Sequence, residues 1–132
     1  MITIQKNIID EISAFAITEL PNEACGYLAG NLNVITKAYL LTNIDKSPEH
    51  FSFDPAEQFK AVKDARSEGI ELLANFHSHP STPARPSIED IRLAYDPNIL
   101  YVIISLLADR PDIKAFQIKD GVVTPEEIKI VT

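Results

Sequence analysis

The stretch Asn75–Asp90 reads NFHSHPSTPARPSIED, and the interpretation of the whole chain starts from it. His77 and His79 are one residue apart at the end of an apolar run, and a helix-start signal follows at Ser87. Asp90 stands one turn into that helix. Two imidazoles and a carboxylate can bind a divalent metal ion and leave one coordination position open for water. The stretch therefore predicts a strand, a loop and a helix around a zinc site of the hydrolytic type.

The segments on both sides of the histidines agree with this placement. The run Ile70–Phe76 is almost continuously apolar, as expected for a central strand that is covered on both faces. Side chains alternate along a strand, so His77 and His79 can point to the same side. Prolines cannot continue a central strand, and three of them predict a stiff loop over the site: Pro80, Pro83 and Pro86.

Helices and strands are expected to alternate along the rest of the chain. Apolar residues at helical spacing predict a helix over Asn7–Leu20, and a capping motif at Asp54 predicts a second helix that ends at Gly69. A short third helix between Ser87 and Pro97 would present one apolar stripe, formed by Ile88, Ile91 and Tyr95. Strands are expected at 26–30, 34–41, 70–76, 99–107 and 113–118, with a last strand over 122–131 that breaks at Pro125. This order predicts an α/β sandwich, a mixed β-sheet flanked by helices.

Composition limits the classes of function. The 132 residues suit one domain, spanning residues 1–132. The net charge of −7 argues against a nucleic-acid partner, which requires a basic face. No apolar run is long enough to span a bilayer, and the N-terminal residues do not resemble an export signal. With one cysteine, no internal disulfide can form, so a cytoplasmic protein is expected.

Hydrolysis at such a site also needs a base that takes a proton from water and returns it to the leaving amine. Glu23 and Glu89 are the acidic candidates by position. Glu89 neighbours Asp90 on a helix and so points about 100° away from it. Glu23 lies on irregular backbone before a glycine-flanked strand, from which it can be aimed at the site, and is the chosen base. The hydroxyl of Ser87 can donate a hydrogen bond to the oxyanion that forms at the carbonyl.

Each of these residues also has a purely structural interpretation. Ser87 and Asp90 fit a capping box, although a serine can cap a helix and still offer its hydroxyl proton. Glu23 by itself is an ordinary solvated carboxylate. Cys25 is expected to be a small buried residue rather than a nucleophile, because both histidines that could serve as its base are better explained as ligands. His50 lies in a polar loop and receives no role. Arg85 is expected to face solvent, although it could hold an anionic group of the substrate.

The assembled pattern resembles the motif of the JAMM (MPN-plus) zinc metalloproteases. It consists of Glu23 upstream, then His77-x-His79, seven residues, Ser87, two residues and Asp90. The match is complete in residue type and spacing. The flanking segments PNEACGYLAG and FHSHP are also similar to those of the family, and the order of elements extends the resemblance over nearly the whole chain.

The resemblance implies a fold, a metal and a substrate class. The fold would be the cytidine-deaminase-like α/β sandwich of MPN domains. One Zn²⁺ would be bound by His77, His79 and Asp90, with Glu23 as general acid/base and Ser87 stabilising the tetrahedral intermediate. The short form resembles prokaryotic members that hydrolyse a peptide or isopeptide bond at the C-terminal Gly-Gly of a ubiquitin-like or sulfur-carrier protein. Two alternatives stay open: a non-catalytic MPN-type interaction module, and a zinc hydrolase of another small amide.

Overall fold

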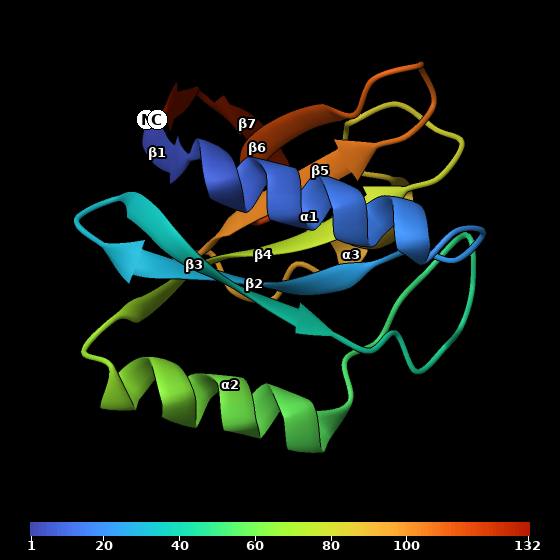
Figure 1. The fold of residues 1–132 in the computed structure, drawn as a ribbon. Coiled ribbons are helices and arrows are strands. Elements are labelled where there is room, and N and C mark those ends of the chain that lie inside the picture. Colours follow the sequence, from blue (N-terminus) through green and yellow to red (C-terminus); the bar gives the residue numbers. More distant parts are fainter.

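The computed structural model describes residues 1–132, which form one eight-stranded sheet and three helices (Figure 1). The helices are α1 (Lys6–Thr18), α2 (Pro55–Ser67) and α3 (Ile88–Arg92). The strands are β1 (Ile2–Gln5), β2 (Cys25–Asn31), β3 (Val34–Leu41), β4 (Glu71–His79), β5 (Leu100–Ser105), β6 (Asp112–Lys119), β7 (Val122–Glu126) and β8 (Ile128–Val131).

The sheet is mixed, as predicted, and its order is β7-β6-β5-β4-β2-β3-β1-β8. Strand β4 lies in the middle, antiparallel to β2 and parallel to β5. Strand β1 pairs in parallel with both β3 and β8, whereas β6 pairs antiparallel with β5 and β7. The central position of β4 covers both of its faces, which explains the apolar residues Leu72, Leu73, Ala74 and Phe76 before the histidines.

Helices cover both faces of the sheet, with α1 on one side and α2 on the other (Figure 1). The α1 side holds the largest apolar cluster, in which Ile8, Ile12 and Ala16 of the helix pack with Ala74 and Phe76 of β4. The opposite face has two smaller clusters, one under α2 and one under α3 and the preceding loop. Because side chains alternate along β4, Asn75, His77 and His79 point to the face that carries α2 and α3.

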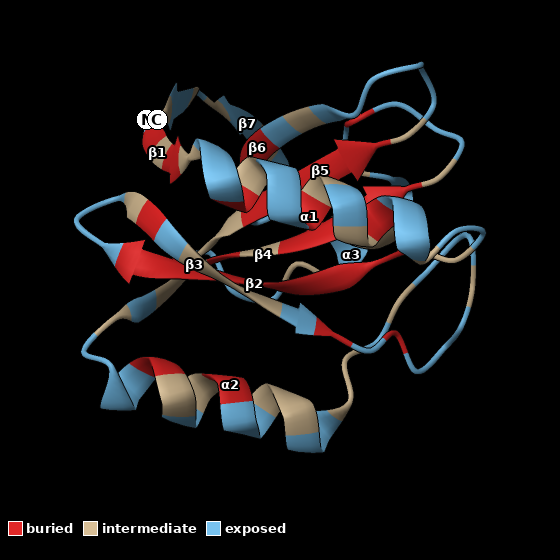
Figure 2. Cartoon of the chain, in the orientation of Figure 1, coloured by how far each residue is buried: buried red, intermediate tan, exposed pale blue.

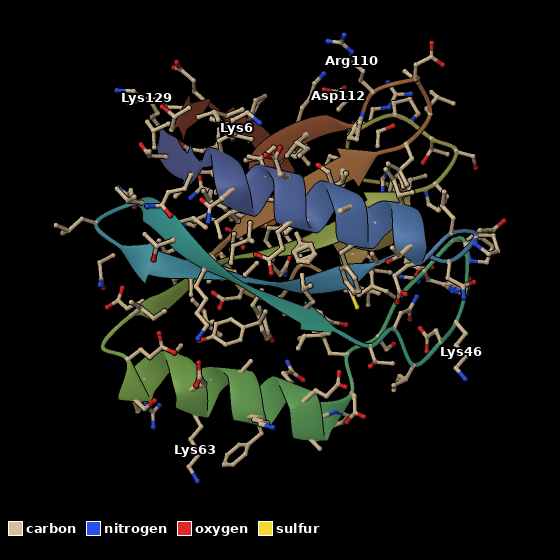
Figure 3. The ribbon with its side chains drawn as sticks, in the orientation of Figure 1. Lys6, Lys46, Lys63, Arg110, Asp112 and Lys129 are labelled. Carbon is tan, nitrogen blue, oxygen red and sulfur yellow. The ribbon has the colours of Figure 1, made fainter.

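Burial follows these layers, with buried residues concentrated on the central strands and exposed residues on the outer surface of the helices and in the loops (Figure 2). Charged side chains such as Lys6, Lys46, Lys63, Arg110 and Lys129 project outward from several different elements (Figure 3). None of the three helices is both long and apolar enough to cross a membrane.

The structure differs from the prediction at both ends of the chain. The predicted helix over Asn7–Leu20 is present as α1, Lys6–Thr18, but it follows a strand, β1, that was not expected, because four residues carry too short a pattern. The C-terminal strand breaks at Glu127, not at Pro125. Pro125 is tolerated within β7 because this strand pairs only with β6.

The predicted apolar stripe on the third helix was also wrong. Helix α3 ends at Arg92, and of the three stripe residues only Ile91 packs against an apolar cluster. The side chains of Ile88 and Tyr95 are 89% and 81% exposed. A five-residue helix lacks the length to keep three residues on one buried face.

Ser78, between the two histidines, joins the end of β4 to the segment before β2. Its Oγ accepts a hydrogen bond from the Ala24 backbone N–H at 2.7 Å, and its own N–H donates to the Ala24 carbonyl at 3.0 Å. Both residues are fully buried. This reciprocal pair fixes the residue that precedes Ala24, Glu23, relative to the histidines.

We expect Ser78→Ala to lower the free energy of unfolding by about 1–3 kcal/mol, because it leaves a buried Ala24 N–H without an acceptor. Chemical denaturation of the metal-free protein measures this. Ser67→Ala is the matched control, since the exposed Ser67 hydroxyl donates only to the Asp64 carbonyl at the end of α2, and its effect should stay within about 0.5 kcal/mol. Equal, small effects of the two substitutions would contradict the assigned role of Ser78.

Candidate metal centre

The three predicted metal ligands converge on one point. His77 Nε2, His79 Nε2 and Asp90 Oδ2 form a triangle in which every side is 3.1 Å. His77 and His79 are buried and come from the end of β4, on the face opposite to α1, whereas Asp90 reaches them from the first turn of α3. The alternation along β4 and the helix that follows the proline-rich loop thus bring together residues up to 13 positions apart.

The triangle has the dimensions of three corners of a small tetrahedral site. Ligands at about 2.0–2.1 Å from a zinc ion in tetrahedral geometry stand about 3.3–3.4 Å from one another. Two imidazole nitrogens and one carboxylate oxygen are also a usual donor set for catalytic zinc, which keeps one position for water. The residues present therefore fit a zinc ion in distance and in chemistry.

The two imidazoles are oriented by different contacts. His79 Nδ1 lies 2.9 Å from the carbonyl oxygen of Pro83, in the proline-rich loop, and so donates its proton there and leaves Nε2 free as a ligand. His77 Nδ1 is buried without a hydrogen-bond partner, and its ring stacks on Phe51 with centroids 4.7 Å apart. Burial lowers the pKa of His79, but the Asp90 carboxylate and the Pro83 carbonyl raise it more, so the net pKa is raised.

One oxygen of Asp90, Oδ2, contacts both the start of α3 and the two histidines of the ligand cluster. The Ser87 N–H donates to Asp90 Oδ2 at 2.9 Å, and the Asp90 N–H donates to Ser87 Oγ at 3.0 Å. The structure thus confirms the capping box. Burial raises the pKa of Asp90, but the hydrogen bonds from the histidines and from Ser87 lower it well below its usual range. Ser87 is exposed and its Oγ acts as an acceptor in the cap, so the hydroxyl proton can still be donated.

Glu23 lies in the irregular segment just before β2 and is almost fully buried, which excludes the interpretation as a solvated carboxylate. Its Oε1 is buried without a hydrogen-bond partner. Burial raises the pKa of Glu23 most, the charges of Asp90 and Glu89 also raise it, and the charge of His79 lowers it; the net pKa is about 8. A buried carboxyl beside the ligand cluster, whose charged form burial disfavours, is placed to take up a proton and to release it again.

Asn43 holds the Glu23 segment to the loop between β3 and α2, and sequence reasoning missed it. Its Nδ2 donates to the carbonyl oxygens of Glu23 and His50, at 3.0 and 3.1 Å, and its Oδ1 accepts from the N–H groups of Asp45 and Ser52. The buried amide thus organises a loop that was predicted only as polar surface. An asparagine directly after a strand is a signal for such a turn, but its partners lie too far away in sequence to be inferred.

The remaining candidates take no part in the cluster. Cys25 is fully buried, as predicted, and burial raises the pKa of its thiol to about 12, so it is no nucleophile. Arg85 and His50 are exposed. A groove of about 420 Å³, bordered by His77 and Asp90, opens beside the cluster, whereas a hollow of about 490 Å³ between β3 and α2 has none of the three ligands in its lining.

Comparison with known proteins gives the family. Residues 5–119 match the family described as prokaryotic homologs of the JAB domain. The chain is similar to the CysO-cysteine peptidase of Mycobacterium tuberculosis, with 32% identity over 137 residues that cover 99% of this chain and 92% of the relative.

Solved structures agree with this match. A solution structure of a protein from Desulfitobacterium hafniense is similar with a TM-score of 0.91 and 51% identity, covering 99% of this chain and 93% of the other. The crystal structure of a JAB1/MPN domain protein from Archaeoglobus fulgidus has the same fold, with a TM-score of 0.68 and 23% identity over 98% and 97% of the two chains. The predicted MPN-type sandwich is therefore confirmed, and the chain belongs to the prokaryotic JAB domain family.

Proposed function

We propose that this protein is a zinc-dependent peptidase that hydrolyses the peptide or isopeptide bond after the C-terminal Gly-Gly of a sulfur-carrier or ubiquitin-like protein. One observation carries the hydrolytic part: a buried carboxyl with a free oxygen, Glu23, lies beside two imidazoles and a carboxylate whose ligand atoms converge. A buried carboxyl without a partner is costly unless it is used.

Each residue has a defined task in this reaction. His77, His79 and Asp90 would hold one zinc ion, which lowers the pKa of water and polarises a carbonyl group. Glu23 takes the proton of the attacking water and passes it to the leaving amine. The hydroxyl of Ser87 donates to the oxyanion of the tetrahedral intermediate while its Oγ continues to cap α3.

The substrate class is proposed from the relatives. The similar mycobacterial protein is named a CysO-cysteine peptidase, and the alignment spans nearly all of both chains. The groove beside the cluster is open at the surface and lies next to His77 and Asp90, so an extended tail has access to the ligand cluster. A flexible C-terminal tail meets that requirement, whereas a folded surface does not.

We expect Glu23→Gln to bind zinc normally and to lose about 1,000-fold in activity, because the amide cannot transfer a proton. The substrate is a sulfur-carrier protein with one cysteine added after Gly-Gly, and intact-mass spectrometry follows its conversion to the Gly-Gly end. Glu11→Gln, on the exposed side of α1, is the control and should cleave like wild type. Full activity of Glu23→Gln would exclude Glu23 as the base.

We expect Asp90→Asn to weaken zinc binding by more than about 100-fold, since an amide oxygen replaces a charged ligand. The amide oxygen can still accept from the Ser87 N–H, so α3 is retained. Competition with a chromogenic chelator measures zinc affinity. Glu89→Gln changes the neighbouring carboxylate and should leave the affinity unchanged. Unaltered zinc binding by Asp90→Asn would rule out Asp90 as a ligand.

A further inference from the structure

The groove beside the ligand cluster lies on the face of the sheet that carries α2 and α3. Its lining includes His77 and Asp90 but neither His79 nor Glu23. In the proposed reaction Glu23 protonates the leaving amine, so the leaving group lies on the Glu23 side of the cluster. The acyl part of the substrate, which is the tail of the carrier, therefore lies over the groove.

A row of aromatic side chains, interrupted by one asparagine, crosses this face of the sheet, and its middle part lines the groove. Residues paired across neighbouring strands point to the same face of a sheet. From β3 to β6 the paired residues are Tyr39, Tyr27, Asn75, Tyr101 and Phe116. Asn75 is smaller than its neighbours and leaves a notch in the row between Tyr27 and Tyr101, both of which also line the groove.

The amide of Asn75 has no structural use that accounts for it. Its Oδ1 is buried and has no hydrogen-bond partner. The adjacent hydroxyls bond elsewhere: Tyr27 Oη accepts from Gln58 Nε2 at 2.7 Å, and Tyr101 Oη donates to the carbonyl of Asp96 at 2.9 Å. An unpaired buried carbonyl oxygen lowers stability, and an apolar side chain would complete the row without that cost. The amide therefore points to a ligand.

The position of Asn75 relative to His77 indicates which part of a tail it would meet. The two residues are on the same face of β4 and two positions apart, which corresponds to about 7 Å along the strand. An extended peptide covers about 3.3–3.6 Å per residue. A tail that runs along the groove from the ligand cluster thus passes Asn75 about two residues before the scissile carbonyl. A side-chain amide has donors and acceptors that match a peptide group.

We propose that Asn75 is a specificity-determining residue whose amide binds the backbone of the carrier's tail about two residues upstream of the scissile bond, in the notch between Tyr27 and Tyr101. This inference rests on the proposed function. Asn75 is not among the three converging ligands, and an amide does not titrate, so it contributes to substrate binding rather than to proton transfer.

Two substitutions of Asn75 separate the amide from the shape of the notch. Asn75→Ala removes the amide and adds no volume, whereas Asn75→Leu removes it and keeps the size. Asn31→Leu is the matched control, because Asn31 is exposed at the end of β2 opposite to the end that pairs with His77. For each zinc-loaded protein, kcat and KM are measured on the carrier extended by cysteine. Calorimetry gives the Kd for the carrier that ends in Gly-Gly.

Both Asn75 variants should raise KM and the Kd of the Gly-Gly carrier about tenfold, which is the usual effect of losing one or two hydrogen bonds, with kcat within about twofold of wild type. The melting temperature of Asn75→Leu should not fall below that of wild type, because an unpaired buried atom has been removed. A merely structural asparagine would show the reverse: a lower melting temperature and unchanged KM.

The contrary outcomes are distinct. If Asn75→Ala binds and cleaves the carrier like wild type, Asn75 does not bind the tail. The same conclusion follows if only Asn75→Leu raises KM, because the leucine would then act by filling the notch. If the wild-type protein neither cleaves this carrier nor binds its Gly-Gly form, the proposed function is wrong and the inference about Asn75 is wrong with it. Cleavage by wild type with unchanged constants for both variants overturns only the inference.

Discussion

The alternation of side chains along β4 is the constraint on which the site depends. It sends His77 and His79 to the face that carries α3, where Asp90 meets them, and Ser78 to the opposite, fully buried face. Ser78 then holds the segment that contains Glu23. A shift of register by one residue would exchange these faces and separate the ligands from Asp90. The strong pairing of β4 with β2 and β5 on both sides prevents such a shift.

The buried polar atoms that lack a hydrogen-bond partner are concentrated in one part of the molecule. Only three buried side-chain nitrogen or oxygen atoms lack a hydrogen-bond partner, and they belong to Glu23, Asn75 and His77. Buried polar groups are normally satisfied, and each exception calls for an explanation. Here all three lie in or beside the ligand cluster, whereas the α1 face of the sheet is made of well-packed apolar residues. One face of the sheet thus packs the apolar core, and the other face carries the unpaired polar groups.

Local patterns were enough to predict much of the fold and the site. The Asp54 cap, the apolar strand that ends at His77 and the capping box at Ser87 are all short-range signals, and the structure contains each of them. The family motif placed Glu23 near the ligands although more than 50 residues separate them. The roles of Asn43 and Asn75 could not be predicted, because an asparagine in a loop or strand acquires its meaning from partners in other strands. Strand β1 and the exposed Ile88 were missed for the converse reason: tertiary pairing and short length overrode the local pattern.

The pairing of β1 with β8 has a consequence for the order of events during synthesis. The two strands are separated by nearly the whole described chain, yet they lie side by side, with the termini adjacent (Figure 1). While the ribosome is still making the intervening residues, the outer edge of β1 has no partner, and an unpaired edge is a place where nascent chains associate wrongly. The edge is covered only when Ile128–Val131 has left the ribosome. The elements that build the metal centre are made earlier, so they can pack before the sheet is complete.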